Sequence, residues 1–389
     1  MDSCRIRRAR CRTAKSFTCH WHALGIDWRM TWLGEKAIMR RLASLCLLAC
    51  LVSIPPRAIA YGEAVNGFPN WSERVLLEWV NRARSDPQTD LAGCSSSTCA
   101  EKACYTTASP PRYLDQNLEH SSRFHSSEML INNYFSHPSQ CTLFTTIGSL
   151  YPSTCGGAAS CACTQGQLTT NQATWTDPFT RMGYFGADTS SASEIIAAGY
   201  VGPDASFYAW EFEPTSNSAC GFHSNGDNGH RYVILFNGYG QLAGGGYTVG
   251  GAYGTYATMD FSGTASTKPK IPSGSHNPQQ AASVDAWVNW YDTAAPSVNK
   301  INVDGVCTDM ALTRGTSTNG AWHLTVNNVG SGCHRYVFAF KDSAGKEVIY
   351  PTTGALTIGN GGAQCPDFSN SPPPGCAGFD RIFANGFEP

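Results

Sequence analysis

The sequence has few charged residues and lacks any apolar run of about 18 residues, the length that a membrane-spanning helix needs. Only 14% of its 389 residues are Asp, Glu, Lys or Arg. Phosphate-binding loops, dinucleotide fingerprints and the Gly-x-Ser-x-Gly element of many serine hydrolases are also missing from it. These absences argue against a membrane transporter, a nucleotide-dependent enzyme and a common kind of esterase.

The amino-terminal segment has the composition of an export signal. Residues 39–60 begin with two arginines directly after Met39, continue with an apolar stretch and finish with an Ala-x-Ala end, which is typical of a cleaved signal peptide. We therefore interpret residues 1–38 as an upstream extension from a misplaced gene start, and expect the exported chain to begin at Tyr61. A lipobox-like Leu-Ala-Cys ends at Cys50, but the apolar run continues beyond it. The protein is expected to be secreted.

Basic residues become scarce when the first 60 residues are removed. That segment holds 11 of the 27 Lys and Arg residues and 3 of the 29 Asp and Glu residues. The remainder keeps 16 basic and 26 acidic residues, a net charge of −10. An acidic chain without a basic stripe is a poor candidate for binding nucleic acid or an anionic membrane surface.

Twelve cysteines follow residue 60, an even number. Eight lie between Cys94 and Cys220, and four lie between Cys307 and Cys376. Exported chains usually pair such cysteines, so each group is expected to close on itself, and Cys307 and Cys333 could pin two strands. A metal–thiolate cluster is the alternative, which export disfavours.

Helix patterns dominate the first half of the chain, and strand patterns the second. Apolar spacing predicts helices within 70–87 and 113–137, whereas alternation within 244–263 predicts a β-hairpin. Short alternating strands beyond residue 280 suggest a small β-sandwich. We expect four further segments: a first domain over 61–263, a linker over 264–280, a β-sandwich domain over 281–362 and a Pro-rich tail over 363–389.

Three stretches together resemble the CAP superfamily, which includes cysteine-rich secretory, antigen and pathogenesis-related proteins and is also called the SCP domain. They are LLEWVNRARSDP (76–87), the segment 113–139 that ends in FSHPS, and NGHRYVIL (228–235). The closest likeness is to bacterial exported members, over about residues 71–262. The resemblance implies an α+β protein: a CAP-type α/β/α sandwich, here followed by a small immunoglobulin-like all-β domain.

The resemblance also implies a cleft with two histidines and two acidic residues. Matched by position, the histidines are His137 of Phe-Ser-His and His230 of Gly-His-Arg. Glu194 stands in Ser-Glu-Ile, where relatives have Gly-Glu-Asn. Glu211 is taken as the second acid, with Glu213 as its alternative. His137, His230 and Glu194 are the candidate ligands of zinc or another divalent metal, because imidazole and carboxylate groups suit that ion.

Two functions follow from such a cleft. The first is non-enzymatic binding of a small apolar ligand such as a lipid, or of a peptide, with an optional metal ion. The second is a metal-assisted hydrolase or protease in which Glu194 is the base. Hydrogen-bonded histidines without any metal are the simplest alternative. A catalytic zinc normally has a third strong protein ligand, and the sequence offers no clear one, which favours binding.

Overall fold

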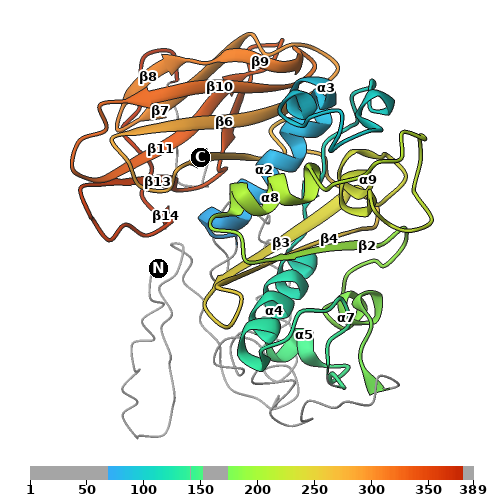
Figure 1. Ribbon diagram of the computed structural model, residues 1–389. Coiled ribbons are helices and arrows are strands. Elements are labelled where there is room, and N and C mark those ends of the chain that lie inside the picture. Colours follow the sequence, from blue (N-terminus) through green and yellow to red (C-terminus); the bar gives the residue numbers. More distant parts are fainter. Residues whose placement is uncertain (1–68, 141, 152–173, 380–389) are drawn as a thin grey trace, which may run out of the picture. The chain divides into compact units, whose positions relative to one another are not determined.

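The computed structural model describes residues 69–140, 142–151 and 174–379, which form an α+β protein (Figure 1). The expected upstream extension 1–38 and signal peptide 39–60 lie outside these residues. Helices and strands are both abundant, and most strand pairs are antiparallel. In the described ranges we find no helix with the length and apolarity to cross a membrane.

One four-stranded sheet with flanking helices occupies the first part of the described chain. Its helices and strands are, in order, α2 (Trp71–Ser85), α3 (Pro87–Asp90), η1 (Leu91–Gly93), η2 (Lys102–Cys104), β1 (Tyr113–Leu114), α4 (Gln116–Asn132), α5 (Ile147–Leu150), α7 (Pro178–Tyr184), β2 (Ser193–Ala198), α8 (Pro203–Glu211), α9 (Gly229–Leu235), β3 (Leu242–Val249) and β4 (Thr255–Ser262). The strand order is β1-β3-β4-β2, and β3 and β4 form the expected hairpin.

Helices α4 and α2 cover opposite faces of this sheet, and the glycines of β3 allow the close approach. A Cβ added at Gly244 or Gly246 would overlap the backbone of α4, whereas one at Gly245 would face α2. On the α4 side, the Ser122 hydroxyl donates to the Gly244 carbonyl at 2.9 Å, and Ser126 does the same to Gly246 at 3.1 Å. Small residues on both elements therefore bring helix and strand into contact (Figure 1).

Helix α2 begins after Asn70, the first residue of the segment that was predicted to be helical. The Asn70 side chain accepts a hydrogen bond from the Glu73 backbone, and the Glu73 carboxylate accepts one from the Asn70 backbone, which is a complete capping box. Every residue from Glu73 to Ser85 is buried, including the polar ones. A helix that is buried on all sides must be covered on every face, and besides β3 the helices α8 and α9 pack against it.

We expect Asn70→Ala to lower the free energy of unfolding by about 1 kcal/mol, because it removes the acceptor for the Glu73 backbone N–H. Denaturant unfolding followed by circular dichroism measures this. Asn225→Ala, in an exposed loop, is the matched control and should change the midpoint little. An unchanged midpoint for Asn70→Ala would show that the cap does not stabilise α2.

Two further sheets form the carboxy-terminal part. Their strands are β5 (Gly274–Asn277), β6 (Ser283–Tyr291), β7 (Val298–Val303), β8 (Val306–Asp309), β9 (Ala311–Thr316), β10 (Asn319–Asn327), β11 (Gly332–Lys341), β12 (Glu347–Tyr350), β13 (Ala355–Asn360) and β14 (Phe368–Ser369). One sheet has the order β5-β6-β10-β9, and the other has β14-β13-β11-β7-β8 with β12 beside β11. Their facing side chains share one core, in which the rings of Trp290 and Phe340 stack at 5.7 Å.

The segment 264–280, expected to be a linker, contains β5 and packs against α2. Residues 271–276 are all buried. The Trp71 indole donates to the His276 carbonyl at 2.6 Å, and the Glu78 carboxylate accepts from the Asn289 amide at 2.6 Å. The burial of this segment was not predicted, because Pro, Ser and Gly are frequent in exposed linkers. The composition of a segment also says nothing about which distant element covers it.

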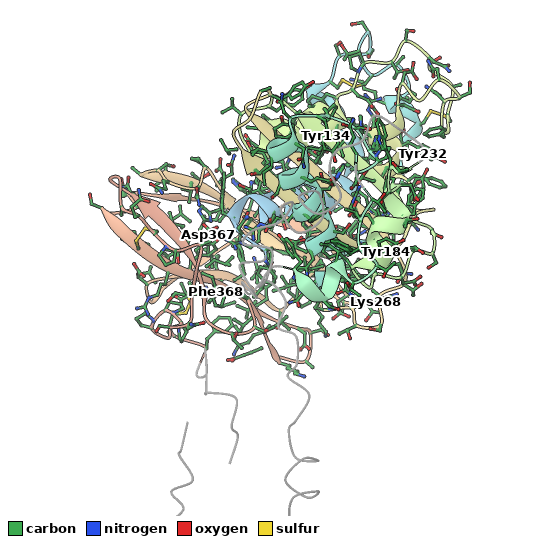
Figure 2. All side chains as sticks on the ribbon, turned by 90° about the horizontal axis from the view of Figure 1, so that it is seen from below. Tyr134, Tyr184, Tyr232, Lys268, Asp367 and Phe368 are labelled. Atoms are coloured by element: carbon green, nitrogen blue, oxygen red, sulfur yellow. A yellow bond between two sulfur atoms is a disulfide. The ribbon has the colours of Figure 1, made fainter. Side chains whose placement is uncertain are left out.

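Four disulfides join described residues: Cys94–Cys99, Cys104–Cys220, Cys307–Cys376 and Cys333–Cys365. The carboxy-terminal cysteines thus close on themselves, as expected. Cys307 and Cys333, however, each pair with a cysteine of the Pro-rich tail. That tail also contributes β14 and Asp367, labelled in Figure 2, whose carboxylate accepts from the Trp71 backbone at 2.9 Å.

Candidate functional site

His137 lies five residues beyond α4, and a carboxylate of β2 holds its ring. The sequence predicted that His137 closes the helix, but α4 ends earlier because Asn133 takes a left-handed conformation with φ of 57°. The His137 Nδ1 is 2.9 Å from Glu194 Oε1. The side chain of His137 is 47% exposed, whereas that of Glu194 is 1% exposed. The ring therefore faces solvent and its carboxylate partner does not.

Arg181, on α7, fixes Glu194 and the loop that carries His137. Its guanidinium forms a buried ion pair with the second oxygen of Glu194. The same group donates to the His137 carbonyl and to the Ser139 hydroxyl, both at 3.1 Å. Burial by itself would raise the pKa of Glu194, but Arg181, His125 and His137 lower it to about 2. Glu194 is consequently an anion at any physiological pH.

Asp260 on β4 lies directly across from Glu194 in the antiparallel pair. It is fully buried. Burial, and next the charge of Glu194, raise its pKa well above the usual value, although Arg181 opposes this. The pKa values of these two neighbouring carboxyl groups are thus shifted in opposite directions, that of Glu194 downward and that of Asp260 upward.

His230 lies in the first turn of α9 and contacts Glu213. Its Nδ1 is 2.7 Å from Glu213 Oε2, and the backbone N–H of Arg231 donates to Glu213 Oε1 at 2.8 Å. Glu211, the residue chosen from the sequence, does not contact His230: it is fully buried, and burial together with Asp90 raises the pKa of its carboxyl. The carboxylate beside His230 is therefore Glu213, because Glu211 ends α8 with its side chain turned inward.

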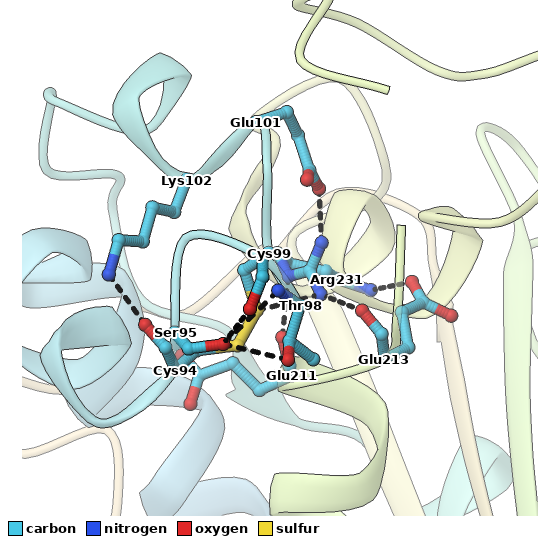
Figure 3. The surroundings of a disulfide bond; sticks show 10 residues. Cys94, Ser95, Thr98, Cys99, Glu101, Lys102, Glu211, Glu213 and Arg231 are labelled. Carbon is cyan, nitrogen blue, oxygen red and sulfur yellow. Dashed lines mark hydrogen bonds and ion pairs between the residues drawn. A yellow bond between two sulfur atoms is a disulfide. The ribbon is translucent and has the colours of Figure 1, made fainter. Parts of the chain in front are cut away.

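Arg231 connects this second pair to a cysteine-rich loop (Figure 3). Its guanidinium forms a buried ion pair with Glu101 and donates to the backbone carbonyls of Glu211 and Glu213. The Cys94–Cys99 disulfide lies against it, with Cys99 Sγ 3.1 Å from Nη2. The loop that bears Glu213 is thereby tied to α9, which holds the His230 ring in place.

The site thus consists of two histidine–carboxylate pairs, His137 with Glu194 and His230 with Glu213. Helices α7, α8 and α9 all pack against β2, the strand of Glu194. Each ring bonds its carboxylate through Nδ1, which leaves Nε2 as the outward atom of the imidazole.

These pairs do not fit the expected zinc centre. In the described ranges, no group of three or more His, Cys, Asp and Glu side chains is placed to hold a metal ion. The carboxylate of Glu194 is already engaged by His137 and Arg181. We therefore derive no chemical step through a metal at this site.

Comparison with known proteins adds little to this description. No protein-family model matches the chain, and no curated protein matches it in sequence. One similar solved structure is described as "Crystal structure of Br derivative BhCBM56"; the match covers 24% of this chain and 95% of that one, with 18% identity and a TM-score of 0.17. A likeness at that score supports no conclusion about fold or ligand.

Proposed function

We propose that this is an exported protein of the CAP type, followed by an immunoglobulin-like β-sandwich, which binds a small apolar ligand with a polar head group. Its layered helix–sheet–helix arrangement and its disulfides support that assignment. The observation that carries the binding function is the pair of imidazoles held by carboxylates, His137 by Glu194 and His230 by Glu213. We propose that both rings face one cleft beside β2.

The chemistry of the two pairs suits recognition of a polar head group. A carboxylate that accepts from Nδ1 fixes the orientation of the ring, so Nε2 presents a fixed hydrogen-bonding atom to a ligand. Binding is favoured over the metal-assisted hydrolase because the described residues offer no third metal ligand. A peptide is the alternative ligand of the same cleft.

Titration of the exported chain with a fluorescent long-chain fatty acid tests the proposal. We expect His137→Ala and His230→Ala each to weaken binding about tenfold, since each removes one hydrogen bond to a charged head group. His334→Ala is the matched control. The Nδ1 atom of His334 also lies 2.7 Å from a carboxylate oxygen, that of Asp304, but His334 is on β11 and not in the proposed cleft. Equal affinity in all four proteins would refute the proposed cleft. Zinc binding that both cleft variants lose would instead favour the hydrolase.

A further inference from the structure

A cavity apart from the two histidine–carboxylate pairs lies beside α9. It has a volume of about 340 Å³ and opens beside the Cys104–Cys220 disulfide. Its lining includes Tyr232 of α9 and the two residues that follow this helix, Phe236 and Asn237. None of the residues of the two histidine–carboxylate pairs lines this cavity, so it is a separate site.

Aromatic rings form one wall of the cavity. Tyr232 and Phe236 are one helical turn apart, and their rings stack at 4.6 Å with an angle of 15°. Phe222 does not line the cavity, but its ring meets that of Tyr232 edge-on at 5.8 Å. Phe222 is 55% exposed and Phe236 is 43% exposed, although aromatic side chains of this size are normally buried. Tyr232, labelled in Figure 2, shows where this wall lies.

Two buried arginines hold this wall rigid. Arg84 donates to the carbonyls of Ile234 at 2.6 Å and Phe236 at 3.1 Å. Arg112 donates to the same Phe236 carbonyl at 3.1 Å. Both arginines are at most 1% exposed. The Cys104–Cys220 disulfide fixes another part of the lining, since both of its cysteines line the cavity. Exposed rings that the fold holds in one position lose little entropy on binding, as a preorganised site requires.

The polar groups of the wall are neutral. No charged side chain is among the described residues that line the cavity; Thr107, Ser109 and Asn237 supply its polar side chains. Arg84 donates to Asn237 Oδ1 at 3.1 Å, which fixes the orientation of the amide and leaves its NH₂ group as a donor. The wall thus presents flat apolar faces beside neutral hydrogen-bonding groups.

We propose that this cavity binds a neutral saccharide. A pyranose ring has a flat face of C–H groups that can stack on an aromatic ring, and it has hydroxyls at its edge that an amide and hydroxyls can bind. A fatty acid or an acidic polymer would find no cation for its carboxylates among the described residues that line this cavity. Asn237 also lines a neighbouring cavity of about 260 Å³, but Arg112 and Lys268 line that one too, so the proposal is confined to the uncharged cavity.

Native gel electrophoresis of the exported chain in gels that contain hydroxyethyl cellulose, xylan or glucomannan tests this proposal. Polygalacturonate serves as the acidic comparison. At least one neutral polysaccharide should retard the protein. Phe236→Ala should weaken that binding about tenfold, through loss of the stacking face. Tyr200→Ala is the matched control, because Tyr200 is 44% exposed and does not line the cavity.

Phe222→Ala keeps the proposal testable if Phe236→Ala does not fold, since the ring of Phe222 lies more than half outside the protein. We expect Phe222→Ala to retain the parent's melting temperature and to bind several-fold more weakly, because the Tyr232 ring of the cavity wall loses its edge-on contact. Four outcomes would overturn the proposal: no retardation by any neutral polysaccharide, equal retardation of the parent and both Phe variants, retardation by polygalacturonate alone, or binding only of a proline-rich peptide. None of these depends on the fatty acid result.

Discussion

Replacing Arg231 with methionine should lower the free energy of unfolding by about 3–5 kcal/mol, because it leaves the buried carboxylate of Glu101 without its partner. Arg231 and Glu101 are both at most 1% exposed. The guanidinium also satisfies the backbone carbonyls of Glu211 and Glu213, which would lose their donor. Chemical denaturation of the purified variant measures the loss.

Two further variants separate the ion pair from the loss of side-chain volume. Arg335→Met, at a half-exposed position on β11 without a carboxylate partner among the described contacts, should cost less than about 1 kcal/mol. Adding Glu101→Gln to Arg231→Met should recover part of the lost stability, since no buried charge then remains unpaired. If Arg231→Met unfolds at the denaturant concentration of the parent, the network does not stabilise the fold.

Replacing Glu78 with glutamine should stabilise the protein at alkaline pH. Glu78 is fully buried where α2 meets β6, and burial raises its pKa to about 7, against the hydrogen bonds from Ser273 and Asn289. A pKa above the ordinary value of 4.5 means that the folded state holds the proton more tightly than the unfolded state. The resulting stabilisation is complete below about pH 4.5 and is lost as the pH rises through about 7. Glutamine keeps a neutral side chain at every pH.

The stability of Glu78→Gln relative to the parent should therefore rise by about 2–3 kcal/mol between pH 5 and pH 9. Thermal or urea unfolding of both proteins at a series of pH values measures this difference. Glu347→Gln, at a partly exposed position of β12, is the control and should give a difference that does not vary with pH. A flat difference for Glu78→Gln would mean that the folded protein carries Glu78 as an anion.

Local signals in the sequence predicted much of the fold. The Asn70–Glu73 cap, the two long helices, the β3–β4 hairpin and the alternating strands of the second part all depend on residues close together in sequence. The packing of β5 and β6 against α2 was not predictable in that way. Its only trace in the sequence is the polar residues of α2 that β5 and β6 cover, such as Glu78 and Asn81, and polar residues at those positions equally predict an exposed helix face.

The candidate site was predictable only in its histidines and Glu194. Arg181 was missed, although it follows Asp177 and Pro178 at a clear helix start, because nothing local shows which carboxylate it meets. Glu213 was weighed and passed over in favour of Glu211, two residues earlier, since the exact end of α8 decides which carboxylate turns outward. Asp260 escaped notice because its partner Glu194 is 66 residues away in sequence and adjacent only through strand pairing.

The Cys104–Cys220 disulfide turns 116 residues of chain into a covalent ring that includes α4, α7 and β2. His137, Arg181 and Glu194 all belong to that ring. A peptide bond cut anywhere between the two cysteines therefore releases no fragment, and the two new ends stay on one molecule. After a single cut the His137–Glu194 pair would therefore remain attached to the His230–Glu213 pair for as long as the disulfide stays oxidised, a protection that suits the export proposed above.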